Sequence, residues 1–160
     1  MSLLLVEPFL STHHCTVAHC SQSSQCFHAP AFCHHSYDTV SLNDKMFLQY
    51  GSFTEIENMQ LLSHIHTLWL DYNSISAITN VAPLKNLTAL YLSNNCLTAL
   101  TGVAALPSLV ILDVSRNNIA EIKPRDLEGM TALKSLDVSA NRLSNIDGIV
   151  DAANLTYAKQ

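Results

Sequence analysis

A fixed pattern of apolar and polar positions recurs along the chain from residue 43 onward. Counted from a leading leucine, further leucines follow three, five, ten and thirteen residues later, and an asparagine follows after eight. The clearest copy has these residues at Leu87, Leu90, Leu92, Asn95, Leu97 and Leu100. The pattern begins again at Ile65, Leu109 and Leu133, so successive copies are 22, 22 and 24 residues apart. Apolar residues that keep such a register indicate an internal repeat, in which each copy forms one structural unit.

Each copy predicts one coil of a solenoid that begins with a short strand. Alternate strand residues point to opposite faces, so the two leucines separated by one residue both point into the coil. A single coil cannot bury its own apolar side, and neighbouring coils must therefore stack and share one core, with their strands paired in parallel. This is the leucine-rich repeat pattern. It predicts an α/β fold, a leucine-rich repeat solenoid that forms a right-handed arc with short parallel strands on its concave face and short helical or extended segments on its convex face.

The asparagine of each copy comes shortly after the strand, where the chain has to turn. A side-chain amide there can donate to and accept from backbone groups that the turn leaves unpaired. We therefore expect a structural role in the turn for Asn73, Asn95, Asn117 and Asn141. A weaker copy precedes Ile65 and has Gly51 where the asparagine is expected.

The repeats form one domain. A leucine-rich repeat domain is predicted at 43–160, with repeats at about 43–64, 65–86, 87–108, 109–132 and 133–154 and an incomplete copy at 155–160. Because that last copy brings no polar closing element for the apolar face of a solenoid, we expect this end to fray or the sequence to belong to a longer protein.

Residues 1–40 do not follow the repeat. They hold four of the five cysteines and six of the eight histidines, a composition that is typical of metal-binding tracts. They contain no Cys-x-x-Cys pair, however, and structural zinc sites usually bring their ligands in such close pairs. We therefore expect a disordered or poorly defined leader rather than a zinc site. The alternative is a disulfide-bonded cap of an extracellular repeat protein, which would need a signal peptide upstream.

The fourth repeat is two residues longer than the others, and its extra residues fall between the asparagine turn and the next strand. Pro124 fits the first turn of a helix, and Asp126 and Glu128 would lie near the helix N-terminus, where the helix dipole favours negative charge. Leu127 and Met130 are three residues apart and can both face the core. We therefore expect a short helix here, and tighter, 3₁₀-like or extended connections in the 22-residue repeats.

The composition argues against several classes of function. The formal charge is −5 and only 13% of the residues are charged, so no basic surface for nucleic acid is predicted. No apolar run approaches the roughly 20 residues that cross a bilayer. We find no nucleophile elbow, no phosphate-binding glycine loop and no His-Glu-x-x-His motif, and so expect no enzyme activity and no cofactor. His64 and His66 lack a third ligand nearby in the sequence, so no metal site is expected there.

Residues between the two strand leucines must point to the opposite face of the sheet, which is the concave face of the arc. In successive repeats these are Phe47, Trp69, Tyr91, Asp113 and Asp137. The residues that follow the strand add Tyr50, Asp71, Tyr72 and Arg116 to the same face. The face is therefore aromatic in its N-terminal half and polar, with acidic positions, in its C-terminal half.

Aromatic side chains are enriched at the centre of protein-binding sites. We predict that these residues form a partner-binding face, with Phe47, Trp69, Tyr72 and Tyr91 at its centre and the charged residues setting the register at its edge. An alternative interpretation is that aromatic side chains on neighbouring strands stack on one another and stabilise the sheet. The two interpretations can hold together.

The N-terminal part of the repeat domain carries a more specific pattern. It reads LND at 42–44, MFLQYGSF at 46–53, IENM at 56–59 and LWLDYNSI at 68–75. This order resembles the opening of the repeat domain in the dynein axonemal assembly factor 1 family, and the resemblance extends from Leu42 to Ile122 and more loosely to Ile149.

The resemblance implies a non-enzymatic protein of the cytoplasm and the cilium or flagellum that is needed to assemble axonemal dynein arms. Its partners would be proteins, such as axonemal dynein chains or their assembly machinery. We expect a monomer that binds neither nucleic acid nor membrane. Two similar groups of the same repeat subclass, the regulatory subunit of protein phosphatase type one and the light chain of outer-arm dynein, are alternatives, and so is an extracellular recognition module.

Overall fold

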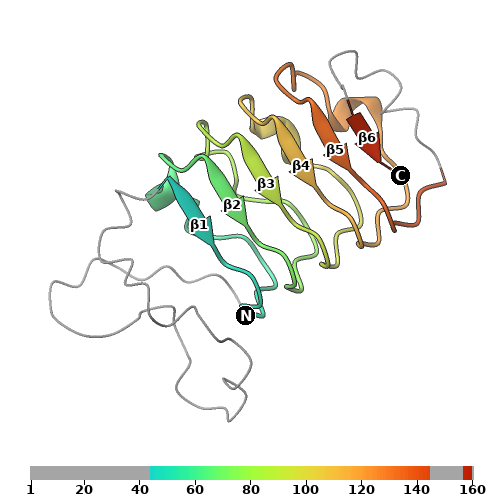
Figure 1. The fold of residues 1–160 in the computed structure, drawn as a ribbon, viewed down its shortest axis with the longest axis horizontal. Coiled ribbons are helices and arrows are strands. Elements are labelled where there is room, and N and C mark those ends of the chain that lie inside the picture. Colours follow the sequence, from blue (N-terminus) through green and yellow to red (C-terminus); the bar gives the residue numbers. More distant parts are fainter. Residues whose placement is uncertain (1–43, 145–156, 160) are drawn as a thin grey trace, which may run out of the picture.

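The computed structural model describes residues 44–144 and 157–159. Within them six short strands form one parallel sheet in sequence order (Figure 1). The strands are β1 (Lys45–Phe47), β2 (Thr67–Trp69), β3 (Ala89–Tyr91), β4 (Ile111–Asp113), β5 (Ser135–Asp137) and β6 (Tyr157–Lys159). The return segments of the same residues contain the 3₁₀ turns η3 (Met59–Leu62), η4 (Val103–Ala105) and η5 (Pro124–Asp126). The predicted stack of coils with a parallel sheet is confirmed.

Parts of the chain lie beyond what the structure describes. The leader predicted at 1–40 and, apart from β6, the C-terminal end for which fraying is predicted lie outside the described residues. The incomplete sixth copy nevertheless contributes a strand, because β6 has three residues, like the other strands, and pairs with β5.

The register of the sheet follows the repeat step. Leu68 of β2 lies opposite Met46 of β1 and Leu90 of β3, and Leu90 lies opposite Leu112 of β4. The 24-residue step causes no shift in register, since Leu112 pairs with Leu136 of β5. Equivalent side chains therefore form columns on both faces of the sheet.

The core is a continuous layer of aliphatic side chains between the sheet and the return segments. In the clearest repeat, Leu90, Leu92, Leu97 and Leu100 are fully buried, at 0% exposure. Val103 of η4 is also fully buried and lies on the return path of the same coil. One coil thus supplies one layer of the core, and the neighbouring coils must cover it.

The repeated asparagine bonds its own coil to the preceding coil. Asn117 Nδ2 donates to Val114 O and Ser115 O of its own coil, at 2.9 and 3.1 Å. The same nitrogen donates to Leu92 O of the preceding coil at 2.9 Å, and Asn117 Oδ1 accepts the Leu97 N–H of that coil at 2.9 Å. The carboxamide therefore satisfies backbone groups that both turns would otherwise leave unpaired.

Asn73, Asn95 and Asn141 make the same set of bonds in their own coils, which confirms the predicted role of the four asparagines. Gly51 holds this position in the first described coil, and a Cβ there would lie 2.1 Å from the ring of Phe53. The buried Phe53 ring therefore occupies the space beside this position, and a side chain at residue 51 would displace it.

Two positions in the repeat adopt a left-handed backbone conformation. The first precedes the turn asparagine or its equivalent, and φ lies between 54° and 58° at Tyr50, Tyr72, Asn94, Arg116 and Ala140. The second lies on the return path at 22-residue intervals, and φ is 58°, 58° and 100° at Asn58, Asn80 and Gly102. Such a conformation costs a residue with a Cβ about 1–2 kcal/mol. The surrounding hydrogen bonds of each coil must therefore hold it in place.

Neighbouring coils approach closely at the second left-handed position. Asn80 Nδ2 donates to Ile56 O of the preceding coil at 2.8 Å. Gly102 takes the equivalent position one repeat later, and a Cβ there would lie only 2.0 Å from Ile78 O. Both the positive φ and the close approach require glycine at residue 102.

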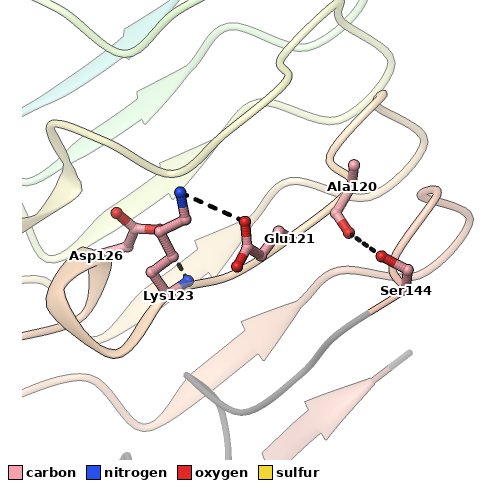
Figure 2. Close-up of polar contacts among 5 residues, drawn as sticks. All are labelled: Ala120, Glu121, Lys123, Asp126 and Ser144. Carbon is pink, nitrogen blue, oxygen red and sulfur yellow. Dashed lines mark hydrogen bonds and ion pairs between the residues drawn. The ribbon is translucent and has the colours of Figure 1, made fainter.

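The longer fourth repeat contains less helix than the sequence predicts. Instead of a helix distinct from the other connections, it has a single 3₁₀ turn, η5, of the same kind as η3 and η4. The prediction was wrong because the N–H groups of Asp126, Leu127 and Glu128 each bond to the carbonyl three residues back rather than four, and Gly129, with φ of 77°, then redirects the chain. Asp126 Oδ2 accepts the Lys123 N–H at 2.9 Å at the start of this turn (Figure 2). Leu127 and Met130 are buried, as predicted.

Replacing Asn117 with alanine is expected to lower the free energy of unfolding by about 2–4 kcal/mol, because buried backbone groups of two coils lose their partner. Asn118→Ala is the matched control, since the Asn118 side chain is half-buried and makes no hydrogen bond within the described residues. It should change the free energy by less than about 0.5 kcal/mol. Urea unfolding followed by circular dichroism measures both, and equal losses would contradict the role given to the carboxamide.

Gly102→Ala is expected to destabilise the protein by about 3 kcal/mol, because the new methyl group would collide with Ile78 O in an already unfavourable conformation. Gly129→Ala provides the comparison, since φ is 77° there but nothing lies within 4 Å of the added Cβ. It should cost only about 1–2 kcal/mol. Thermal unfolding measures the difference, and a Gly102 variant as stable as the Gly129 variant would rule out the close approach.

Candidate functional site

The side of the sheet that points away from the core carries two columns of stacked aromatic rings. In the first column Phe47 stacks on Trp69, with ring centroids 4.3 Å apart and planes 11° apart, and Trp69 stacks on Tyr91 at 5.3 Å and 4°. In the second column Tyr50 stacks on Tyr72 at 4.6 Å and 14°. These spacings follow from the register, because neighbouring parallel strands lie about 4.8 Å apart. We call this side of the sheet the open face.

The rings are ordered by stacking and remain accessible. Tyr50 and Tyr72 are 65% and 49% exposed, and Phe47, Trp69 and Tyr91 are half-buried. Trp69 has a ring against each of its faces, so its accessible surface lies largely at the ring edge. The structure thus places these residues on the open face, where they stack as the alternative interpretation expects. Partner binding there stays a prediction.

Aspartates continue the open face, and each accepts a backbone hydrogen bond. Asp113 and Asp137 each accept, through Oδ1, the N–H of the serine two residues ahead at 2.9 Å. These two carboxylates close their own turns. Asp71 Oδ1 instead accepts the Ser93 N–H of the following coil at 2.9 Å, and so ties two coils together.

The electrostatic environment of the open face alters two protonation equilibria. Burial raises the pKa of the Asp71 carboxyl above its usual value, hydrogen bonds from Ser93 lower it, and the charge of Asp113 raises it further. The net effect is a raised pKa. The pKa of the Tyr50 hydroxyl is also raised, by desolvation first and then by the Tyr72 hydroxyl and the Asp71 carboxylate.

A comparison with protein families agrees with this geometry. A family model described as "Leucine Rich repeats (2 copies)" matches residues 85–128 and 107–151. The chain has a leucine-rich repeat fold.

Solved leucine-rich repeat structures resemble the chain. Internalin C2 from Listeria monocytogenes is 28% identical with a TM-score of 0.58, and the match covers 68% of this chain and 47% of that one. A leucine-rich repeat protein from Leptospira interrogans is 25% identical with a TM-score of 0.62, and the match covers 69% of this chain and 29% of that one. A chain of the Drosophila melanogaster SNF/U2A′ complex is 28% identical with a TM-score of 0.53, and the match covers 62% of this chain and 60% of that one. Each match thus spans less than two thirds of the solved chain. A comparison with curated proteins found no match.

The leucine-rich repeat register also places residues on the open face that the sequence analysis did not select. Ile111, the first residue of β4, is 37% exposed. The first and third residues of a strand point to the same face, so the strand period alone could have identified it. Lys159 of β6 pairs in register with Asp137 of β5. Arg116, which the sequence analysis did select, is exposed at the left-handed position that follows β4.

Other parts of the leucine-rich repeat domain offer less for binding. A hollow of about 210 Å³ lies among return segments, but three of its charged groups already have partners. Lys123 Nζ lies 3.4 Å from Glu121 Oε2, and Asp126 Oδ2 accepts the Lys123 N–H (Figure 2). No group of three or more His, Cys, Asp or Glu side chains in the described residues is placed to hold a metal ion. The same part of the chain has no helix with the length and apolar character of a membrane span.

Asp71→Asn is expected to stabilise the protein at pH 7, and this gain should shrink toward pH 4. A raised pKa means that the folded state holds the proton more tightly than the unfolded chain. Stability from protonation is then fully present below the unfolded pKa of about 3.9 and is lost as the pH rises through the folded pKa. Asparagine removes the charge and keeps an oxygen to accept the Ser93 N–H. Urea unfolding at both pH values measures the effect, and a variant less stable than the parent at pH 7 would refute it.

Proposed function

We propose that the chain is a non-enzymatic scaffold that binds a protein partner on the open face, with Trp69 and Tyr72 at the centre of contact. The observation that carries this proposal is the pair of aromatic columns, whose rings are fixed by one another and still present accessible edges. Tryptophan and tyrosine contribute most of the binding energy at many protein interfaces.

Stacking prepares these side chains for binding. A mobile aromatic side chain loses rotamer freedom when a partner covers it, and this loss weakens association. On the open face Trp69 lies between Phe47 and Tyr91, so much of that freedom is already lost in the unbound protein. A partner can therefore gain the contact energy of the ring edges at a smaller entropic cost.

The finer proposal is that the partner belongs to the machinery that assembles axonemal dynein arms, and that the protein works in the cytoplasm and the cilium or flagellum. Its support is the resemblance of the N-terminal repeats, from LND to LWLDYNSI, to the dynein axonemal assembly factor 1 family. Among the similar structures, the SNF/U2A′ structure is that of a complex, which supports the general scaffold role only.

Trp69→Ala and Tyr72→Ala are each expected to weaken partner binding by at least about tenfold, since each removes an accessible aromatic contact. Leu61→Ala is the control, because Leu61 is 53% exposed but lies in η3 on the return path, away from the sheet. Tagged variants incubated with extract of ciliated cells are probed for axonemal dynein chains and, in parallel, for the catalytic subunit of protein phosphatase type one.

Full capture of dynein chains by folded Trp69 and Tyr72 variants would exclude the open face as the binding surface. Capture of phosphatase without dynein would support the regulatory-subunit alternative instead. Thermal unfolding of each variant separates lost contact from lost structure, because the stacked rings also stabilise the sheet.

A further inference from the structure

The first aromatic column ends in a step. Trp69 stacks against one face of the Tyr91 ring, and the next residue in register beyond the ring is Asp113. An aspartate side chain is much shorter than a tyrosine side chain, so the outer part of the second ring face stands above the carboxylate. Tyr91 and Asp113 are both half-buried, and within the described residues no aromatic ring or cation stacks on that second face. The step leaves room for one more planar group.

The carboxylate below the step is only partly satisfied. Asp113 Oδ1 accepts a backbone N–H, whereas no hydrogen bond or ion pair within the described residues involves Oδ2. The exposed Arg116 makes no ion pair with Asp113 in the described part of the chain. Oδ2 of Asp113 is therefore available to accept hydrogen bonds from a cationic group of a partner.

The shape of the step favours a planar cation. A guanidinium group can stack on an aromatic face and at the same time donate two parallel hydrogen bonds to a carboxylate. An ammonium group is a compact point charge, so it gains only the electrostatic attraction to the carboxylate. Ile111, on the same strand as Asp113, is 37% exposed and offers apolar surface to the methylene groups of a long basic side chain.

We propose that the step between Tyr91 and Asp113 is a binding slot for an arginine side chain of the protein partner, which would stack on Tyr91 as the next rung of the column. The proposal rests on the proposed function of the open face and adds the chemistry of the partner. The charge is complementary at the slot itself, since Asp113 is the next residue in register beyond Tyr91, and the chain carries a formal charge of −5.

The single tryptophan of the chain reports binding in the slot, because Trp69 stacks directly on Tyr91. Its fluorescence should change when a further planar group stacks on Tyr91. The probe is a capped peptide of three glycine-serine-arginine units, and the same peptide with lysine is the comparison. We expect the arginine peptide to bind at least about fivefold more tightly, as a stacked and bidentate contact requires. Calorimetry provides a second readout that does not depend on fluorescence.

Asp113→Asn should weaken binding of the arginine peptide at least about fivefold while keeping an oxygen for the backbone bond. Glu128→Gln is the matched control, because it removes one negative charge from an exposed residue of a return segment. It should change the affinity by less than about twofold. Tyr91→Leu should bring the arginine peptide down to the affinity of the lysine peptide, whereas Tyr91→Phe should preserve the preference.

Equal affinities for the two peptides, or equal effects of the Asp113 and Glu128 variants, would overturn the slot and leave only nonspecific charge attraction. The experiments distinguish failure of the arginine slot from failure of the proposed function. If Trp69→Ala abolishes dynein capture while Asp113→Asn retains it and binds the arginine peptide normally, the open face binds the partner and the slot does not. If dynein capture survives the aromatic substitutions, the proposed function fails, and the peptide titration still decides whether the slot prefers arginine.

Discussion

The fold depends on one side-chain group, the asparagine carboxamide that joins each coil to the preceding one. Apolar packing alone does not fix how one coil lies against the next, because hydrophobic attraction has no direction. Asn95 supplies direction, since it accepts the Ile75 N–H and donates to Leu70 O in one coil while donating to Leu92 O in its own. Loss of this group leaves backbone groups of two coils unpaired, so a single substitution weakens a junction rather than one turn.

The same constraint determines the chemistry of the open face. In-register strands place equivalent residues about 4.8 Å apart, and a side-chain type that recurs at one position becomes a column. The rings of Phe47, Trp69 and Tyr91 are spaced accordingly, at 4.3 and 5.3 Å. The next two residues in register are Asp113 and Asp137, where the column changes from aromatic to acidic. The register therefore joins two surfaces of different chemistry end to end.

Counting along the sequence was enough for the register and the core, because the leucine spacing alone decides which residues align. It was not enough where local geometry competes with the repeat. Pro124 and the Asp126 side chain favour the start of a helix, but Gly129, in a left-handed conformation, redirects the chain after one 3₁₀ turn, which no spacing rule predicts. Asp71 and Asp113 both lie on the open face, yet Asp71 bonds to the following coil and Asp113 to its own. Asp113 ends its strand, whereas Asp71 lies two residues beyond one, and the leucine spacing does not specify which backbone group a carboxylate at either position accepts. The apolar pattern is equally silent about left-handed residues such as Tyr72.

The left-handed tyrosines also bear on whether the rings are there for stability alone. A left-handed conformation costs a residue with a Cβ about 1–2 kcal/mol, so Tyr50 and Tyr72 together cost about 2–4 kcal/mol. The specific ring–ring contribution of about 0.5–1.5 kcal/mol, which excludes area burial, is smaller than that cost. Asparagine tolerates the conformation better, and Asn94 takes the same position in the next coil. The turn therefore does not require tyrosine. A role of the two exposed rings at the protein surface explains their presence better than a role in the backbone conformation.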